Sequence, residues 1–249
     1  MLDARAERTL TEVTAQLRAV CGDRLVTVAL YGSGASTDYV PGKSDLNLVI
    51  VLDELDEPPL AAIRSHVARW HKRGVATPLL LDRGFLQNAL DVFPMELFDI
   101  KERHRVLFGA DLFTGLAINN QNLRYECEHE ARGKLLRLRE LYLEIGDRPA
   151  KLQALVLDSL KTFLVILRTL SRLRGLPPTA SHEEAVRVFC HGFQHELPLL
   201  SRLLRVKLGK ERWSGTAEEI FHAYVTELRG LVRLIDHLST DQPEEHGRS

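Results

Sequence analysis

The sequence predicts an α+β protein, in which an N-terminal part of alternating strands and helices is followed by an all-α helical bundle. Before about residue 110, short β-branched and apolar runs end at glycine or at an acidic residue, which is typical of strands. From residue 119 onward, long amphipathic stretches follow one another with Gly and Pro between them. We therefore expect domains at 1–118 and 119–240 and a disordered tail at 241–249.

The first part begins with apolar residues spaced by three and four, which predict a helix over 6–20. The runs RLVTVALYG and DLNLVIVLD predict two strands, and the segment between them starts as a helix-capping turn and becomes a loop at Pro41 and Gly42. A helix from Pro58 through Trp70 and a third strand in TPLLLD follow. The segment FPMELFDIKERHRVLFG, residues 93–109, predicts one more strand or two short ones.

The second part predicts five helices, over 123–145, 149–175, 181–193, 196–209 and 216–238. Pro149 and Pro198 stand near helix openings, where a missing N–H costs little. These long helices have enough apolar surface for a homodimer.

Composition limits the class of protein. The chain has 249 residues, 45% of them hydrophobic, which is ample for a core. A net charge of -1 provides no global basic field for nucleic-acid binding. The three cysteines are far apart and predict neither a disulfide framework nor a zinc site. No segment reads as a signal peptide or approaches the roughly 18 apolar residues of a membrane span. We expect a cytoplasmic protein without a membrane partner.

The stretch YGSGAS places a Gly-Ser turn directly after a strand. Such a turn at the start of a helix presents main-chain N–H groups to an anion. Gly32 lets the backbone approach a ligand, and Ser33 supplies a hydroxyl. Gly34 and Ser36 keep the side chains at the start of the expected helix small. Lys43 either reaches a phosphate or is a solvated turn residue. Gly32 and Ser33 are thus candidate phosphate-binding residues, or they simply turn a strand into a helix.

Asp45 and Asn47 lie two residues apart in the second predicted strand. Alternate strand residues point to the same face, roughly 6.5–7 Å apart, and can flank one metal ion. Mg²⁺ prefers oxygen ligands, usually one or two carboxylates with phosphate oxygens and water. The pair is a candidate site for Mg²⁺ or Mn²⁺. Alternatively, Asp45 is a capping or surface carboxylate and Asn47 only hydrogen-bonds the preceding loop.

Together these features resemble the nucleotidyltransferase superfamily, which includes DNA polymerase beta and the kanamycin nucleotidyltransferases. In that superfamily a strand, a Gly-Ser turn and a helix are followed by D-x-D on the next strand, and Gly32-Ser33 and Asp45-Leu46-Asn47 stand at the matching spacing. The resemblance implies a mixed sheet flanked by helices and an NTP substrate. The helical part resembles domains attached to aminoglycoside-modifying members and to HEPN-type partners.

The chain departs from D-x-D, because Asn47 removes one negative charge facing the metal and the triphosphate. The superfamily also places a third acidic residue on a later strand, often as the base for the acceptor hydroxyl. The candidates here are Asp82, Glu96 and Asp99, each of which also fits an ordinary strand-end acid. Glu96 and Asp99 are three residues apart and cannot both share one face of a regular strand.

Basic residues outnumber acidic ones in 132–174. They either contact substrate phosphates or RNA, or they form a solvated surface in which they pair with acidic residues. The second case is the commoner one in proteins. The basic residues are Arg132, Lys134, Arg137, Arg139, Arg148, Lys151, Lys161, Arg168, Arg172 and Arg174. RVFCH and RLIDH are one residue too short for the R-x4-6-H signature of HEPN-type ribonucleases. His191 and His195 are four apart, but Gly192 and Pro198 oppose one continuous helix and hence a metal site there.

Two functions follow from the resemblance. The first is Mg²⁺-dependent transfer of an NMP from an NTP to a hydroxyl of a small molecule, a protein or RNA. The second is a catalytically degenerate protein of the same fold that acts as a nucleotide- or partner-binding module.

Overall fold

The structure is a computed structural model that describes residues 2–42 and 44–238. The chain divides into two compact units, Met1–Ile118 and Asn119–Ser249. Lys43 and the tail expected at 241–249 lie outside the described residues. Within the described ranges, no helix is both long enough and apolar enough to cross a membrane.

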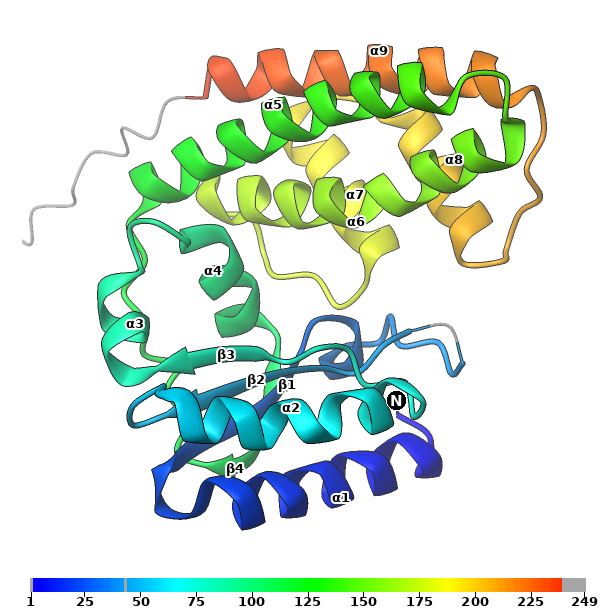
Figure 1. The fold of residues 1–249 in the computed structure, drawn as a ribbon. Coiled ribbons are helices and arrows are strands. Elements are labelled where there is room, and N and C mark those ends of the chain that lie inside the picture. Colours follow the sequence, from blue (N-terminus) through cyan, green and yellow to red (C-terminus); the bar gives the residue numbers. More distant parts are fainter. Residues whose placement is uncertain (1, 43, 239–249) are drawn as a thin grey trace, which may run out of the picture. The chain divides into compact units, whose positions relative to one another are not determined.

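The first unit is built around a four-stranded sheet in the order β3-β2-β1-β4 (Figure 1). Its strands are β1 (Leu25–Tyr31), β2 (Asn47–Leu52), β3 (Leu79–Asp82) and β4 (His104–Gly109). β1 pairs antiparallel with β2 and β4, whereas β2 pairs parallel with β3. The mixed sheet flanked by helices is therefore confirmed.

Helices cover both faces of this sheet (Figure 1). α1 (Ala4–Cys21) and α2 (Glu57–His71) pack on the face that carries Leu48 and Ile50, and the short η1 (Gly22–Arg24) follows α1. α3 (Arg83–Asn88) and α4 (Pro94–Glu102) pack on the face that carries Val49 and Val51. Successive side chains of β2 point to opposite faces of the sheet, and both faces are covered by helices. This explains why nearly every residue of β2 is apolar.

The prediction for residues 93–109 is correct for β4 and wrong for α4, and α3 was not expected. Pro94 occupies the first turn of α4, where its missing N–H costs nothing. The helix buries Met95, Leu97 and Ile100, so tertiary packing selects the helical conformation over the extended one. Gly109 ends β4 at a φ of 80°, and a Cβ there would lie 1.8 Å from the carbonyl oxygen of Val26, so only glycine fits.

The second unit is all-helical, as predicted. Its helices are α5 (Asn120–Ile145), α6 (Pro149–Leu173), α7 (His182–Phe193), α8 (Pro198–Lys207) and α9 (Ala217–Asp236). Side chains of Asn119, Ser181 and Thr216 cap the amides at the start of α5, α7 and α9. Local capping signals therefore mark the helix starts that the sequence indicates.

Candidate functional site

The Gly-Ser turn follows β1 as η2 (Gly32–Ala35), a single short 3-10 turn. Gly32 has a φ of 70°, which favours glycine, and its N–H donates to the carbonyl oxygen of Arg103 at 3.3 Å. A Cβ at Gly32 would lie 3.4 Å from Nδ2 of Asn47. The side chain of Asn47 therefore lies against the turn.

The α-helix expected after the Gly-Ser turn does not form, and this prediction is wrong. Two glycines in the turn and the β-branched Thr37 and Val40 after it disfavour a helix, and Pro41 prevents its extension. The amide and the hydroxyl of Ser36 instead donate to the carbonyl oxygen of Ser33, at 3.1 Å each. A phosphate here therefore has no long helix dipole to attract it, and the amides of Gly32 and Ser36 already have acceptors.

Tyr31 and Asn47 are cross-strand partners at the end of the β1–β2 ladder. Directly opposed residues share a face of the sheet, and Tyr31 packs against the cluster on the α4 side. Asp45 precedes Asn47 by two residues with buried Leu46 between them, so strand alternation places Asp45 and Asn47 on the same side. Asp45 is exposed, and within residues 2–42 and 44–238 its carboxylate makes no hydrogen bond or ion pair.

Two candidate carboxylates come together above this face. Glu96 and Asp99 lie three residues apart on α4, a spacing that makes them neighbours on a helix surface. Burial of the phenol, followed by the charges of Glu96 and Asp99, raises the pKa of Tyr31 to about 12. Both carboxylates therefore act electrostatically on the Tyr31 phenol. The expectation that Glu96 and Asp99 cannot share a face applies to a strand. It is wrong here because both residues lie on a helix.

Arg103, directly after α4, joins a buried charge cluster. Its Nη1 lies 3.3 Å from Oδ2 of Asp38, and its Nη2 lies 3.6 Å from Oδ1 of Asp99. The side chains of Arg103 and Asp38 are only 9% and 5% exposed. Asp38 belongs to the loop after η2, so the cluster connects this loop to α4.

Sequence reasoning missed Tyr31, Asp38 and Arg103. Strand alternation and an antiparallel register would have placed Tyr31 beside Asn47. Asp38 and Arg103 are 65 residues apart, and no local pattern marks either residue.

Asp82 does not join the other candidates. Its carboxylate caps α3 by accepting the Phe85 N–H at 2.6 Å. In the β2–β3 register Asp82 pairs with Leu52, five residues beyond Asn47 along β2, which separates them by roughly 16 Å. Asp82 thus has a local structural role at the opposite end of the strand.

The donors near the turn fit a metal ion only in part. In the part of the chain that the structure describes, no three His, Cys, Asp or Glu side chains are arranged to hold a metal. The available ligands are the carboxylate of Asp45 and the amide oxygen of Asn47. Such a set suits a divalent cation shared with nucleotide phosphates, because Mg²⁺ is usually bound by one or two carboxylates together with phosphates and water. It does not suit a metal held by the protein alone.

Many of the cations in the helical unit already have partners. Arg132 pairs with Glu128 and Asp236, and Arg137 pairs with Glu140. The guanidinium of Arg148 donates to the carbonyl oxygens at the end of α5. These contacts favour a paired surface over an open phosphate site.

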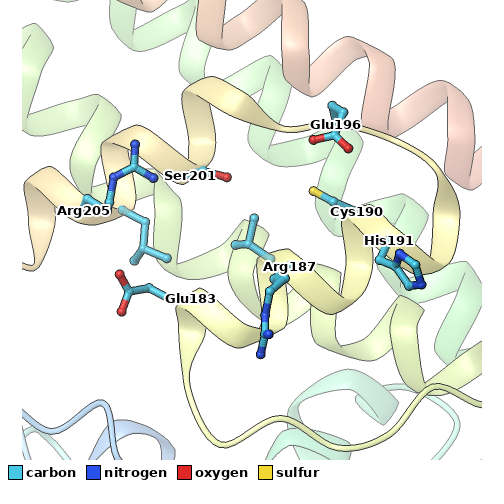
Figure 2. Close-up of a pocket in the computed structure, with 9 residues that line it drawn as sticks. Glu183, Arg187, Cys190, His191, Glu196, Ser201 and Arg205 are labelled. Carbon is cyan, nitrogen blue, oxygen red and sulfur yellow. The ribbon is translucent and has the colours of Figure 1, made fainter.

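α7 and α8 border a cavity of about 400 Å³ (Figure 2). Glu183 and Arg205 lie at one end, and Cys190 and Glu196 lie at the other. Burial raises the pKa of Cys190, so this thiol stays protonated at neutral pH. α7 ends at Phe193 and Gln194 is left-handed, with a φ of 49°, so His195 lies beyond the helix that carries His191. The cavity holds charges of both signs and no metal-binding histidine pair.

Comparison with known proteins bears on the fold. No model of a protein family matches the chain, and no curated protein matches it. The chain superimposes on spectinomycin adenyltransferase AAD(9) from Enterococcus faecialis, solved with ATP and spectinomycin, with a TM-score of 0.56 over 90% of this chain and 99% of that one, at 11% identity. A nucleotidyltransferase-like protein from Exiguobacterium sibiricum aligns over 91% of this chain and 74% of its own, at 13% identity, with a TM-score of 0.31.

The identities are too low to transfer an activity or a substrate. The TM-score of 0.56 nevertheless extends over nearly the whole length of both chains. This chain therefore has the fold of the nucleotidyltransferase superfamily.

Proposed function

We propose that this protein is a Mg²⁺- or Mn²⁺-dependent nucleotidyltransferase that moves an NMP from an NTP to a hydroxyl group of an acceptor. The observation that carries the proposal is the arrangement at the end of the β1–β2 ladder. There the Asn47 amide lies against the Gly32 turn and the exposed Asp45 precedes Asn47 by two residues, on a nucleotidyltransferase fold. The charges of the Glu96 and Asp99 carboxylates act on the neighbouring Tyr31.

Each residue has a distinct role in this proposal. The Ser33 hydroxyl and the turn amides other than those of Gly32 and Ser36 bind the triphosphate, and Asp45 and Asn47 would hold the cation together with phosphate oxygens. The cation, when bound, neutralises triphosphate charge. Glu96 accepts the proton of the acceptor hydroxyl, whose oxygen bonds to the α-phosphorus as the bond to the β-phosphate oxygen breaks and pyrophosphate leaves. Most of the catalysis then comes from positioning and charge neutralisation.

The structural neighbour suggests where to start with substrates. That protein was solved with ATP and spectinomycin, so ATP and a small-molecule hydroxyl are the first pair to test here, before protein and RNA acceptors. Cys21, Cys127 and Cys190 are free thiols, which agrees with action in a reducing cytoplasm.

One observation favours the second function, a nucleotide- or partner-binding module without turnover. Asn47 removes a charge from the metal site, and no third metal-binding side chain replaces it among the described residues. Such a protein would hold a nucleotide at the turn and release it unchanged.

Incubation with ATP, GTP, CTP and UTP labelled in the α-phosphate, with Mg²⁺ or Mn²⁺ and a panel of acceptors, separates the two functions. Pyrophosphate release and label transfer that Asp45→Ala abolishes support the enzyme. Asp53→Ala is the control, because Asp53 is an exposed carboxylate just after the other end of β2, where it pairs with Arg83. Nucleotide binding without turnover in the unmodified protein, with turnover appearing only in Asn47→Asp, supports the module.

A further inference from the structure

Arg103 ties α4 to the Gly32 turn through its main chain. Its N–H donates to the carbonyl oxygens of Asp99 and Ile100, at 3.1 and 3.2 Å, which closes the end of α4. Its own carbonyl oxygen accepts the N–H of Gly32 at 3.3 Å. The peptide groups on the two sides of one residue thus contact the helix that carries Glu96 and the turn proposed to bind phosphate.

The side chain of Arg103 makes a second connection between the same two segments. Its guanidinium pairs with Asp99 on α4 and with Asp38 in the loop after the turn. Asp38 is linked back to the turn, because its N–H donates to Oγ of Ser36 at 3.2 Å, and this hydroxyl donates to the Ser33 carbonyl oxygen at 3.1 Å. A continuous chain of contacts therefore runs from α4 to Ser33.

We propose that Arg103 is a positioning residue that sets the distance between the phosphate-binding turn and α4. This inference rests on the proposed function, in which Ser33 binds the triphosphate and Glu96 on α4 accepts a proton. The side chain of Arg103 is only 9% exposed, so in this proposal it acts through other residues and not on the substrate. It acts by holding Asp38 and Asp99 at once with a planar, forked guanidinium.

The geometry requires arginine rather than any cation. A guanidinium presents several N–H donors in a fixed fork, whereas a lysine ammonium is a point charge on a flexible stem. Lysine at position 103 has its three donors on one nitrogen, so it cannot reproduce the two separate nitrogens, Nη1 and Nη2, that Arg103 presents to Asp38 and Asp99. The charge would be kept and the connection between the loop and α4 would be lost.

A purely structural role is the alternative, because removing one partner from a buried charge cluster destabilises a protein. A triple variant separates the two roles. Asp38→Asn, Asp99→Asn and Arg103→Met together remove all three charges of this cluster, and stability should largely return. The triple variant still lacks the Arg103 side-chain contacts that connect the loop after the turn to α4.

The experiment compares Arg103→Lys, Arg103→Met and the triple variant with Arg105→Met. Arg105 is the matched control, because it lies two residues further on, is 44% exposed and pairs only with Glu7 of α1 among the contacts that the structure gives it. The readouts are the melting temperature, kcat and KM for the NTP, and hydrogen exchange of the Gly32 amide. The last readout reports on the turn whether or not the protein turns over a nucleotide.

We expect Arg103→Lys and the triple variant to melt close to the unmodified protein and to lose at least tenfold in kcat/KM. We also expect at least tenfold faster exchange at Gly32, whereas Arg105→Met changes neither quantity. Normal kcat/KM and slow exchange in the triple variant would overturn the positioning role. If the unmodified protein shows no turnover, the proposed function fails and the exchange rate of Gly32 alone decides the role of Arg103.

Discussion

Gly32 and Asn47 are packed so closely that a Cβ added at residue 32 would lie 3.4 Å from Nδ2 of Asn47. Gly32→Ala places a side chain on a backbone with a φ of 70° and presses it against this amide. We expect the free energy of unfolding to fall by about 1–2 kcal/mol. Nucleotide affinity, measured by calorimetry, should fall as well, because the turn and Asn47 move apart.

Gly22→Ala is the control for backbone strain, since Gly22 has a φ of 55° and open space around its Cβ position. It should lose stability and keep nucleotide affinity. Equal loss of affinity in both variants would mean that the contact between Gly32 and Asn47 has no part in binding.

Asn47→Asp restores a carboxylate beside the turn. We expect Mn²⁺ to bind roughly 10–100-fold more tightly in the presence of a nucleotide, because one extra charge then faces the cation at short range. Electron paramagnetic resonance titration of Mn²⁺ measures this affinity. Asn88→Asp, which adds the same charge at an exposed position of α3, should leave it unchanged.

Asp82→Ala separates capping from catalysis. Loss of the bond from the Phe85 N–H should lower the free energy of unfolding by about 1 kcal/mol, measured by urea denaturation. Asp82→Asn keeps a good cap and should keep this stability. Because Asp82 lies at the far end of β2 from Asn47, neither variant should change the transfer rate. A loss of activity in both variants would mean that Asp82 belongs to the candidate site after all.

The Tyr31 phenol should ionise near pH 12, because burial and the charges of Glu96 and Asp99 raise its pKa. The folded protein then keeps this proton after the unfolded chain, with a pKa near 10, has released it. Stability is therefore fully present below pH 10 and falls as the pH rises toward 12, by about 2–3 kcal/mol for this group.

Absorbance titration at alkaline pH measures the Tyr31 ionisation, and Tyr31→Phe identifies it by removing the step. Glu96→Gln removes one of the two negative charges and should shift the step to lower pH. An unchanged step in Glu96→Gln would show that this carboxylate lies further from Tyr31 than the structure has it.

Glu227 allows the pH dependence of stability to be tested within the helical unit, independently of the candidate site. Its carboxylate accepts the N–H groups of Leu199 and Leu200, at 2.9 and 2.8 Å, at the start of α8, while burial raises its pKa. A raised pKa means that its contribution to stability is present at low pH and is lost as the pH rises through the folded-state value. The stability of Glu227→Gln relative to the unmodified protein should therefore increase from pH 4 to pH 7.

Urea denaturation at several pH values measures this trend for Glu227. Glu227→Ala leaves both amides without a side-chain acceptor and should lower the free energy of unfolding by about 1–3 kcal/mol at pH 4 and by less at pH 7. A stability difference between Glu227→Gln and the unmodified protein that does not vary with pH would contradict the raised pKa.

Local pattern was sufficient for much of the fold. β-branched runs predicted β1 and β2, and their spacing around the Gly-Ser turn predicted the nucleotidyltransferase fold. Amphipathic periodicity predicted the helices of the second unit. These features are readable because strand alternation and helical period repeat within a few residues along the chain. The same local reading failed at α4, where packing of Leu97 and Ile100 against the sheet decides the conformation.

The sequence by itself determined that Gly32, Ser33, Asp45 and Asn47 stand at a spacing that resembles the nucleotidyltransferase superfamily. Only the tertiary structure brought Glu96 and Asp99 to Tyr31, tied Asp38 to Arg103 and removed Asp82 from the group. The physical reason is distance along the chain. Contacts between residues about 60 apart arise from strand register and from the face on which a helix packs, and neither is encoded in the periodicity of a short segment.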